Sequence, residues 1–168
     1  MCNNYIIREY CQGDEEYVAD AHARVYLEEY NWGPAFSDYA AHVAYDFSER
    51  GTSSGEKMWI AEVDGERVGC IMLCRTDDPA AGQLRLFLVE KAFRRNGIGN
   101  TLIDTLISEA KTFGYEKLIL WTAHPLVEAI HCYEEKGFEK IQTTNNTDWS
   151  LSGETVYELQ YEMKLLGY

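Results

Sequence analysis

Long hydrophobic runs are missing from this sequence of 168 residues, and no stretch approaches the roughly 20 apolar residues that cross a bilayer. The N-terminus, MCNNYIIREY, lacks the basic region, the apolar stretch and the cleavage site of a secretory signal. We therefore expect a cytoplasmic protein that does not act on membranes. The length and the apolar content of 46% predict one domain over residues 1–168, with a core of its own.

Closely spaced cysteines and histidines are missing as well. The five cysteines form no C-x-x-C pair, and the four histidines lack the spacing of a zinc finger, so we predict no metal site. An odd number of scattered cysteines is typical of a reducing compartment, which favours free thiols over a disulfide framework. Cys70 and Cys74 lie four residues apart in a strand-like run, so we expect both on one face of that strand.

Basic residues are scarce, since 15 lysines and arginines stand against 28 aspartates and glutamates, for a net charge of −13. Binding to nucleic acid depends on the neutralisation of phosphates by basic residues, so this charge argues against a nucleic-acid partner. It also disfavours anionic membranes. A cationic or neutral partner fits the charge better, although net charge mainly reports solubility.

Against this acidic background, the stretch FRRNGIG (residues 93–99) places two arginines beside two glycines. It lies between a strand-like run over 83–90 and a helix-like run over 98–113. A helix N-terminus exposes unpaired N–H groups and a partial positive charge, and glycine lets a ligand come close to the backbone. The combination predicts a phosphate cradle, to which the arginines would add charge-assisted hydrogen bonds.

Two other kinds of phosphate loop are excluded. A Walker loop ends in Gly-Lys-Ser/Thr, which does not occur in this stretch. A dinucleotide-binding fingerprint needs a third glycine and an acidic residue after the next strand. Taken alone, the glycine pair is equally well explained as a plain tight connection between a strand and a helix.

The periodicity of the chain predicts an α+β fold with a mixed, mostly antiparallel sheet flanked by helices. Consecutive strands in the first half suggest antiparallel meanders, and the strand–helix–strand unit over 83–122 suggests one parallel crossover. Asp64-Gly65 favours a tight hairpin turn, and Asp14 is a candidate N-cap for the first helix. The expected strands cover 5–10, 57–63, 66–74, 83–90, 116–122, 138–143 and 157–165, and the expected helices cover 14–30, 36–49, 98–113 and 126–136.

Residues 84–138 carry two motifs that resemble the GNAT family of N-acetyltransferases. In that family the acetyl-CoA loop reads Arg/Gln-x-x-Gly-x-Gly/Ala and opens a long helix after a strand, and Arg94, Gly97 and Gly99 fill these positions. The second motif is a strand followed by a helix with Ala-Ile-x-x-Tyr that ends in Gly-Phe. The stretch LWTAHPLVEAIHCYEEKGF matches it at Ala129, Ile130, Tyr133, Gly137 and Phe138.

The order of elements in that family also agrees over nearly the whole chain, so the resemblance implies a GNAT-like acyl-CoA N-acyltransferase fold. The runs FLV, LWT and EEYNW are similar to the acetyltransferase module found fused to MarR-type regulators. That likeness covers the catalytic module only. One departure is Leu126, which stands where the family often has an asparagine that contacts pantetheine or CoA.

The resemblance implies an acyltransferase that moves an acetyl group from acetyl-CoA, its co-substrate, to a primary amine by direct attack in a ternary complex. The acceptor would be a small molecule or a peptide. The pyrophosphate of acetyl-CoA would lie on backbone amides of the glycine-bearing loop, with the Arg94 side chain beside them. The loop residues concerned are Arg95, Asn96, Gly97, Ile98, Gly99 and Asn100.

The pantetheine arm would pair like an extra strand with the backbone of Phe87, Leu88 and Val89, whose side chains are expected in the core. An amide of Val89 or Leu88 would bind the thioester carbonyl. Tyr133 would be the general acid, because a phenol is protonated at neutral pH and can donate to the developing thiolate. The alternative for Tyr133 is a core residue of an amphipathic helix.

On the acceptor side we expect Glu29 and Trp32 to contact the substrate, with Tyr30 and Trp149 as further candidates whose alternative role is packing. The general base stays open among Glu28, Glu29 and Glu62, each of which is also a plausible solvated carboxylate. The net charge of −13 favours polyamine, amino-sugar, small-amine or lysine-like acceptors.

An acyl-CoA-binding sensor that keeps the fold and the donor loop without catalysis is the alternative function. A third possibility is an enzyme that uses a longer acyl group or an oxygen acceptor. Tyr133 favours the enzyme, because binding alone needs no phenol at the thioester. We expect a monomer or a homodimer, the latter through the last strand if that strand lies at a sheet edge.

Overall fold

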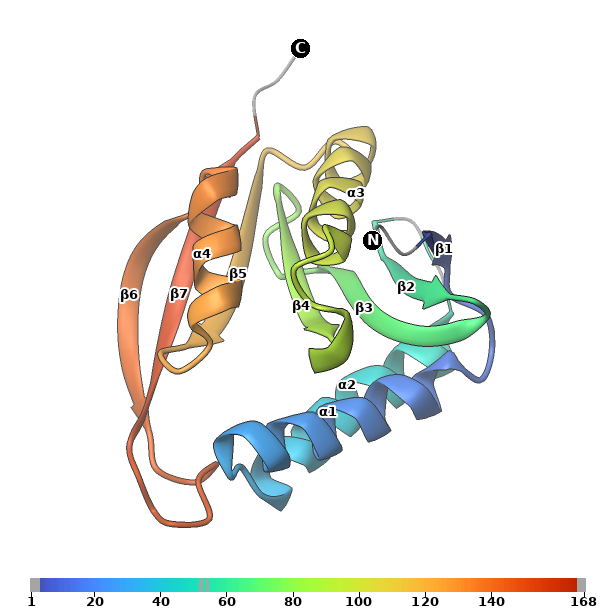
Figure 1. Cartoon of the computed structure of the whole chain (residues 1–168). Coiled ribbons are helices and arrows are strands. Elements are labelled where there is room, and N and C mark those ends of the chain that lie inside the picture. Colours follow the sequence, from blue (N-terminus) through green and yellow to red (C-terminus); the bar gives the residue numbers. More distant parts are fainter. Residues whose placement is uncertain (1–3, 52, 54, 166–168) are drawn as a thin grey trace.

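One mixed sheet organises the part of the chain that the computed structural model describes, residues 4–51, 53 and 55–165 (Figure 1). The described strands number seven, follow the order β1-β2-β3-β4-β5-β7-β6, and include a single parallel pair, β4 with β5. This is the predicted mixed sheet with one parallel crossover. The elements are β1 (Tyr5–Glu9), α1 (Asp14–Tyr30), α2 (Pro34–Arg50), β2 (Lys57–Val63), β3 (Glu66–Arg75), β4 (Ala81–Val89), a 3-10 turn (Lys91–Phe93), α3 (Ile98–Thr112), β5 (Lys117–Ala123), α4 (Val127–Lys136), β6 (Glu139–Asn146) and β7 (Val156–Lys164).

The helices cover the sheet on both faces, with α1 and α2 on one side and α3 and α4 on the other (Figure 1). Apolar residues recur along α3 at helical spacing, and Leu102, Ile103 and Leu106 are fully buried against β2 to β5. On the opposite face, Val18 of α1 and Phe47 of α2 pack on β2 and β3. Among the described residues, none of the helices combines the length and the apolar character that crossing a bilayer needs.

The hairpin between β2 and β3 turns as its residues predict, because Asp64 and Gly65 both adopt positive φ, 50° and 79°. The alternation of strand faces is also confirmed for Cys70 and Cys74, which are buried in one apolar cluster with α1 and α2. The described cysteines, Cys11, Cys70, Cys74 and Cys132, are free thiols, whereas Cys2 lies outside the described residues.

One expectation about the end of a helix was wrong, and one condition set for the last strand is not met. Asp14 is not the N-cap of α1, a position that Gly13 occupies with a φ of 104°. Its buried carboxylate instead accepts hydrogen bonds from the backbone N–H of Cys11 and from the guanidinium groups of Arg8 and Arg67. β7 does not lie at the edge of the sheet, because it pairs with β5 on one side and with β6 on the other.

The feature that positions the site is a bulge in β4. Cys70 pairs with Leu88 and Met72 with Arg85, so two residues of β4 face the single Ile71 of β3. Leu86 takes a φ of 50° at this point, which is rare for a residue with a branched side chain. β4 stays paired to β5 only from Ala81 to Leu84, and beyond the bulge the two strands diverge (Figure 1).

Candidate active site

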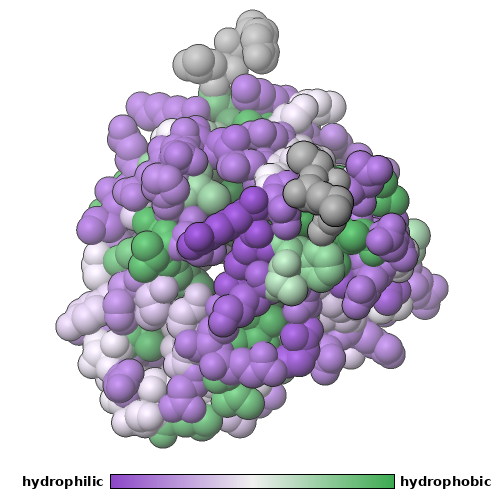
Figure 2. All heavy atoms as spheres, in the orientation of Figure 1, coloured by the Kyte–Doolittle hydropathy of each residue, from purple (hydrophilic) through white to green (hydrophobic). Residues whose placement is uncertain are grey.

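A cavity of about 560 Å³ lies where β4 and β5 separate. α1 and α2 supply one wall, β4 and β5 the floor, and α4, β6, β7 and the loop before β7 the remainder. Hydrophilic residues dominate the face seen in Figure 2, and a small opening lies near its middle, over the place that β4 and α4 flank in Figure 1. The sheet therefore provides a concave site at the strand ends, a common place for a ligand.

The glycine-bearing loop presents a row of free backbone donors at the start of α3. Within the described residues, none of the backbone N–H groups from 95 to 100 donates to another protein group. Arg95 and Gly97 both adopt positive φ, 64° and 84°, which turns the chain into the helix. Such a turn before a helix N-terminus concentrates N–H dipoles, the arrangement that binds phosphate.

The two glycines of this loop are needed for different physical reasons. Gly97 holds the left-handed conformation, and its carbonyl accepts hydrogen bonds from Tyr5 and Thr101. A side chain at Gly99 would lie 3.2 Å from the ring of Phe87, so the missing Cβ lets α3 pack closely on β4. One glycine therefore shapes the loop and the other sets its distance from the sheet.

The two arginines of the loop have different surroundings. Arg94 donates to both carboxylate oxygens of Glu29 at 2.7 Å and, through Nε, to the carbonyl of Val89 at 2.9 Å. Arg95 is largely exposed and pairs at 3.1 Å with the exposed Glu128. The guanidinium of Arg94 thus joins the loop to α1, while Arg95 is the more accessible positive charge. The predicted contact of Glu29 with a substrate would have to compete with its bidentate ion pair.

The side of β4 that β5 has left carries backbone groups without a strand partner, close in sequence to the cavity-lining Phe87. The N–H of Glu90 donates to Val68 of β3, and hydrogen-bonding direction alternates along an antiparallel ladder. The N–H of Leu88 therefore points toward β3, whereas that of Val89 points away from it, to the side that β5 has left. Phe87 also lines the cavity.

Tyr133 of α4 lines the cavity from the side opposite β4 and is only 4% exposed. The rings of Phe87 and Phe138 lie 5.9 Å from its ring, and no described residue hydrogen-bonds its hydroxyl. Burial raises the pKa of Tyr133 well above its ordinary value, so the phenol is protonated throughout the neutral range. The hydroxyl is a free donor in an apolar setting.

Aromatic side chains form the wall on the side of α1 and α2. Trp32 is buried and lines the cavity together with Tyr26, Phe36 and Trp149, with centroid distances of 4.6 to 5.4 Å among them. Tyr30 packs on this cluster without lining the cavity. Trp32 and Trp149 thus stand where a substrate could reach them, and their contact with an acceptor stays a prediction.

None of the three carboxylates considered as a base lines the cavity. Glu28 is exposed, Glu29 is paired with Arg94, and Glu62 accepts from Arg8 at 2.6 Å. Two other proton acceptors do line it, His22 and Glu158. His22 has a signal in the sequence, because Val18, Ala21, His22 and Val25 follow the spacing of a buried helical stripe.

His22 is 2% exposed, and its Nδ1 donates to the carbonyl of Val18 at 2.7 Å. A carbonyl only accepts, so Nδ1 carries the proton of the neutral ring and Nε2 has a lone pair. Burial lowers the pKa of His22 to about 4. The ring is therefore neutral at physiological pH.

We expect His22 to make the fold sensitive to acid. Between pH 6.5 and about 4 the unfolded chain binds a proton at His22 that the folded chain does not, so stability falls as the pH falls through this window. The full effect is about 3 kcal/mol. Urea unfolding at pH 7 and pH 4 should show this extra loss in the wild type and not in His22→Asn. The exposed His42→Asn variant is the control and should behave like the wild type; equal pH dependence in all three proteins would contradict the assignment.

Residues 4–51, 53 and 55–165 contain no cluster of three or more His, Cys, Asp or Glu side chains that could hold a metal ion. The polar groups that line the cavity include the phenol of Tyr133, the neutral imidazole of His22, the guanidinium of Arg85 and the carboxylate of Glu158, and the free N–H groups of residues 95–100 lie at the start of α3. These groups can bind an anion, hold an extended chain and donate a hydrogen bond to a leaving group.

Comparison with known sequences gives a match to the model of the acetyltransferase (GNAT) family over residues 19–138. N-acetyltransferase 8 of Homo sapiens is 34% identical over 97 residues, which cover 55% of this chain and 41% of that protein. N-acetylaspartate synthetase of Danio rerio is 29% identical over 102 residues, which cover 61% of this chain and 36% of that protein. The chain thus spans less than half the length of these two curated relatives.

Solved structures share the fold over almost the whole chain. An acetyltransferase of the GNAT family from Staphylococcus aureus superposes with a TM-score of 0.79 at 23% identity, over 97% of this chain and 100% of that one. The Salmonella typhimurium protein yncA, solved with its cofactor acetyl-CoA, superposes with a TM-score of 0.77 at 16% identity, over 99% and 96% of the two chains. At these identities the likeness concerns the fold.

Proposed function

Because the chain belongs to the acetyltransferase (GNAT) family, we propose that it moves the acetyl group of acetyl-CoA to a primary amine by direct attack in a ternary complex. One observation carries the proposal. The free N–H groups of residues 95–100 lie at the start of α3, which follows β4 after a short 3-10 turn, and Phe87 of β4 and Tyr133 line the cavity where β4 and β5 separate. A phosphate, an extended arm and a thioester need these groups in this order.

The pyrophosphate of acetyl-CoA would occupy the amides of residues 95–100. The positive end of α3 favours an anion there, and Arg95 adds an accessible positive charge in a chain of net charge −13. Arg94 would act mainly by holding the loop to α1, since its guanidinium is already bound to Glu29.

The pantetheine arm would lie along Phe87, Leu88 and Val89 as an added strand. The alternation of the β3–β4 ladder favours Val89 over Leu88 as the donor to the thioester carbonyl, because its N–H points to the open side. A donor placed at the developing oxyanion is worth about 3 kcal/mol of transition-state stabilisation.

The amine attacks the thioester carbon, the carbon–sulfur bond breaks, and the thiolate of CoA leaves. Tyr133 would donate a hydrogen bond to that sulfur. Its raised pKa makes complete proton transfer to a thiol of ordinary pKa near 8.5 unfavourable, so the phenol serves as a donor to the thiolate. The attacking amine must be neutral. Glu158 of β7 lines the cavity and could take its proton, whereas the lowered pKa of His22, about 4, makes that ring a weak base.

Several finer expectations stay predictions. They include a single domain over the whole chain, a cytoplasmic location, the likeness to modules of MarR-type fusions, and a monomeric or homodimeric state. The edge strands of the described sheet are β1 and β6, so a second copy could pair with one of these but not with β7, which lies inside the sheet. The relatives' names point to amine acceptors, and the name N-acetylaspartate synthetase points to an amino acid. For this chain we propose only the class of acceptor, an amine, and no particular compound.

Release of the CoA thiol from acetyl-CoA, measured with and without a panel of amines, tests the function. We expect release that depends on at least one amine and a stoichiometric acetylated product. Tight acetyl-CoA binding without amine-dependent release over a broad panel would overturn the proposed acetyltransferase activity and favour an acyl-CoA sensor. Release with alcohols but not with amines would instead identify an oxygen acceptor.

A further inference from the structure

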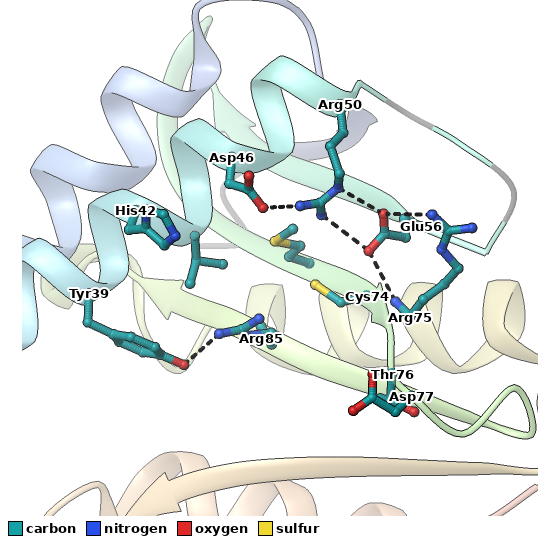
Figure 3. A pocket seen from close by; sticks show the side chains of 12 residues that line it. Tyr39, His42, Asp46, Arg50, Glu56, Cys74, Arg75, Thr76, Asp77 and Arg85 are labelled. Carbon is teal, nitrogen blue, oxygen red and sulfur yellow. Dashed lines mark hydrogen bonds and ion pairs between the residues drawn. The ribbon is translucent and has the colours of Figure 1, made fainter.

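A second cavity, of about 400 Å³, lies between α2 and the ends of β3 and β4 (Figure 3). Three arginines line it, and two of them are neutralised. Arg50 pairs with Asp46 and with Glu56, and Arg75 reaches the buried Glu56 through its backbone N–H at 3.1 Å and its guanidinium at 3.9 Å.

Arg85 is the third arginine and has no such partner. Its hydrogen bond to a described residue goes from Nη2 to the hydroxyl of Tyr39 at 2.7 Å, as Figure 3 shows. No carboxylate of a described residue lies within 4 Å of its guanidinium, although the residue is half-buried. A charge held in a partly desolvated place without a counter-ion is costly, so its retention needs a reason.

The position of Arg85 supplies that reason. Arg85 and Tyr39 line both cavities, including the larger one where β4 and β5 separate. The bulge puts Arg85 opposite Met72, which packs toward α1 and α2. The side chain of Arg85 therefore lies on the face of the sheet that α1 and α2 cover, where Trp32 is expected to contact the acceptor. The oxygen of Tyr39 accepts from Arg85, which leaves the hydroxyl proton of Tyr39 available to donate.

We propose that Arg85 and Tyr39 bind a carboxylate of the acceptor, which makes the acceptor an amino carboxylic acid. This inference rests on the proposed function of the same cavity. A planar guanidinium matches a carboxylate in shape and charge, and the phenol adds a second donor. Glu158 of β7 lines the same cavity, and its negative charge disfavours a dianionic group such as a phosphate.

The remainder of the acceptor would meet the aromatic wall. Tyr26, Trp32, Phe36 and Trp149 line the cavity on the side of α1 and α2. Their surface suits an apolar or aromatic side chain. The net charge of −13 does not oppose an anionic substrate group, because the local charge at the contact matters more than the charge of the whole chain. Arg85 supplies that local positive charge, and it is the only lysine or arginine among the described residues that line the cavity.

Binding of reaction products to the CoA-loaded protein tests the proposal without turnover. N-acetylphenylalanine and N-acetylphenylalaninamide, or the corresponding leucine pair, differ in the carboxylate and carry no ionisable amine. Isothermal titration calorimetry should show each acid binding more tightly than its amide by roughly tenfold or more. Acids that bind no better than their amides would overturn the carboxylate site.

Variants assign the effect to Arg85. Arg85→Gln should remove the preference for the acid, and Arg85→Lys should keep part of it, because lysine retains the charge without the planar fork. Arg75→Gln is the matched control, since it removes a positive charge from the neighbouring cavity and should leave the preference unchanged. A preference that survives in Arg85→Gln, or that Arg75→Gln abolishes equally, would contradict the assignment. Should Arg85→Gln not fold, the comparison of acids with amides on the wild-type protein still decides whether the cavity binds a carboxylate.

Turnover separates this inference from the proposed function. Phenylalanine, leucine and their amides are offered with acetyl-CoA, and thiol release is followed. Release with the amides together with equal binding of acids and amides would leave the acetyltransferase intact and reject the carboxylate site. Arg85-dependent binding of the acids without release from any amine would keep the site and reject the enzyme.

Discussion

The Gly97→Val variant is expected to lose acetyl-CoA binding by roughly a hundredfold or more, about 3 kcal/mol, while it keeps its fold. Gly97 has a φ of 84°, a conformation that a β-branched residue adopts only with strain. Its carbonyl is fixed by Tyr5 and Thr101, so relief of the strain has to move the peptide units that carry the free N–H groups. Isothermal titration calorimetry with CoA measures the loss, and circular dichroism checks the fold.

Gly114→Val provides the matched control. Gly114 follows α3 at its other end with a φ of 89°, and nothing lies within 4 Å of the place where its Cβ would be. The same substitution there imposes similar backbone strain far from the loop, so it should lower stability without loss of CoA affinity. Wild-type affinity in Gly97→Val would show that the loop merely connects β4 to α3.

Tyr133→Phe is expected to lower turnover by roughly tenfold or more, with little change in acetyl-CoA affinity. The change removes a hydroxyl that no described residue holds and keeps the ring that packs on Phe87 and Phe138. Single-turnover kinetics with a working acceptor measure the effect. Because burial raises the pKa of Tyr133, ionisation of this phenol should not limit the rate anywhere in the neutral range.

The control for Tyr133→Phe is Tyr115→Phe. Tyr115 is also buried, and its hydroxyl donates to the carbonyl of Gly55 at 2.7 Å, away from the cavity. Loss of that hydrogen bond should reduce stability by about 1 kcal/mol and leave turnover unchanged. An unaltered rate in Tyr133→Phe, with chemistry rate-limiting, would remove Tyr133 from the reaction.

The sequence predicted the order of elements well because each element has a local cause. The stripe of apolar residues on α3, the Asp64-Gly65 turn and the glycines after α3 and α4 act within a few residues. The ends were less predictable. Pro34 is the first residue of α2, where proline is favoured, although the helix was expected from residue 36. β6 runs to Asn146, into a stretch expected to be a loop, because β7 holds it by pairing.

The features of the candidate site also differ in whether their causes are local in the sequence. The tight turn before α3 was predictable, since the helix start and the glycine spacing are local features of the sequence, and its role as a phosphate loop stays a prediction. The positive φ of Leu86 was not predictable, because leucine gives no local reason for it and the strand pairing on both sides imposes it. Nor could the sequence pair Arg94 with Glu29, 65 residues away, or show that Arg85 lacks a carboxylate partner. Such facts depend on which residues the fold brings together.

The short β4–β5 ladder has a consequence for the stability of the protein. Its four residue pairs join the strands that α1 to α3 cover to those that carry α4, so this seam should be the first part of the sheet to open. A pantetheine arm in the gap would extend the seam, and substrate occupancy would then slow amide hydrogen exchange on both sides. At a hundred times its dissociation constant, a ligand adds about 2.7 kcal/mol to the unfolding free energy. Bound acetyl-CoA would in this way also hold the two parts of the sheet together.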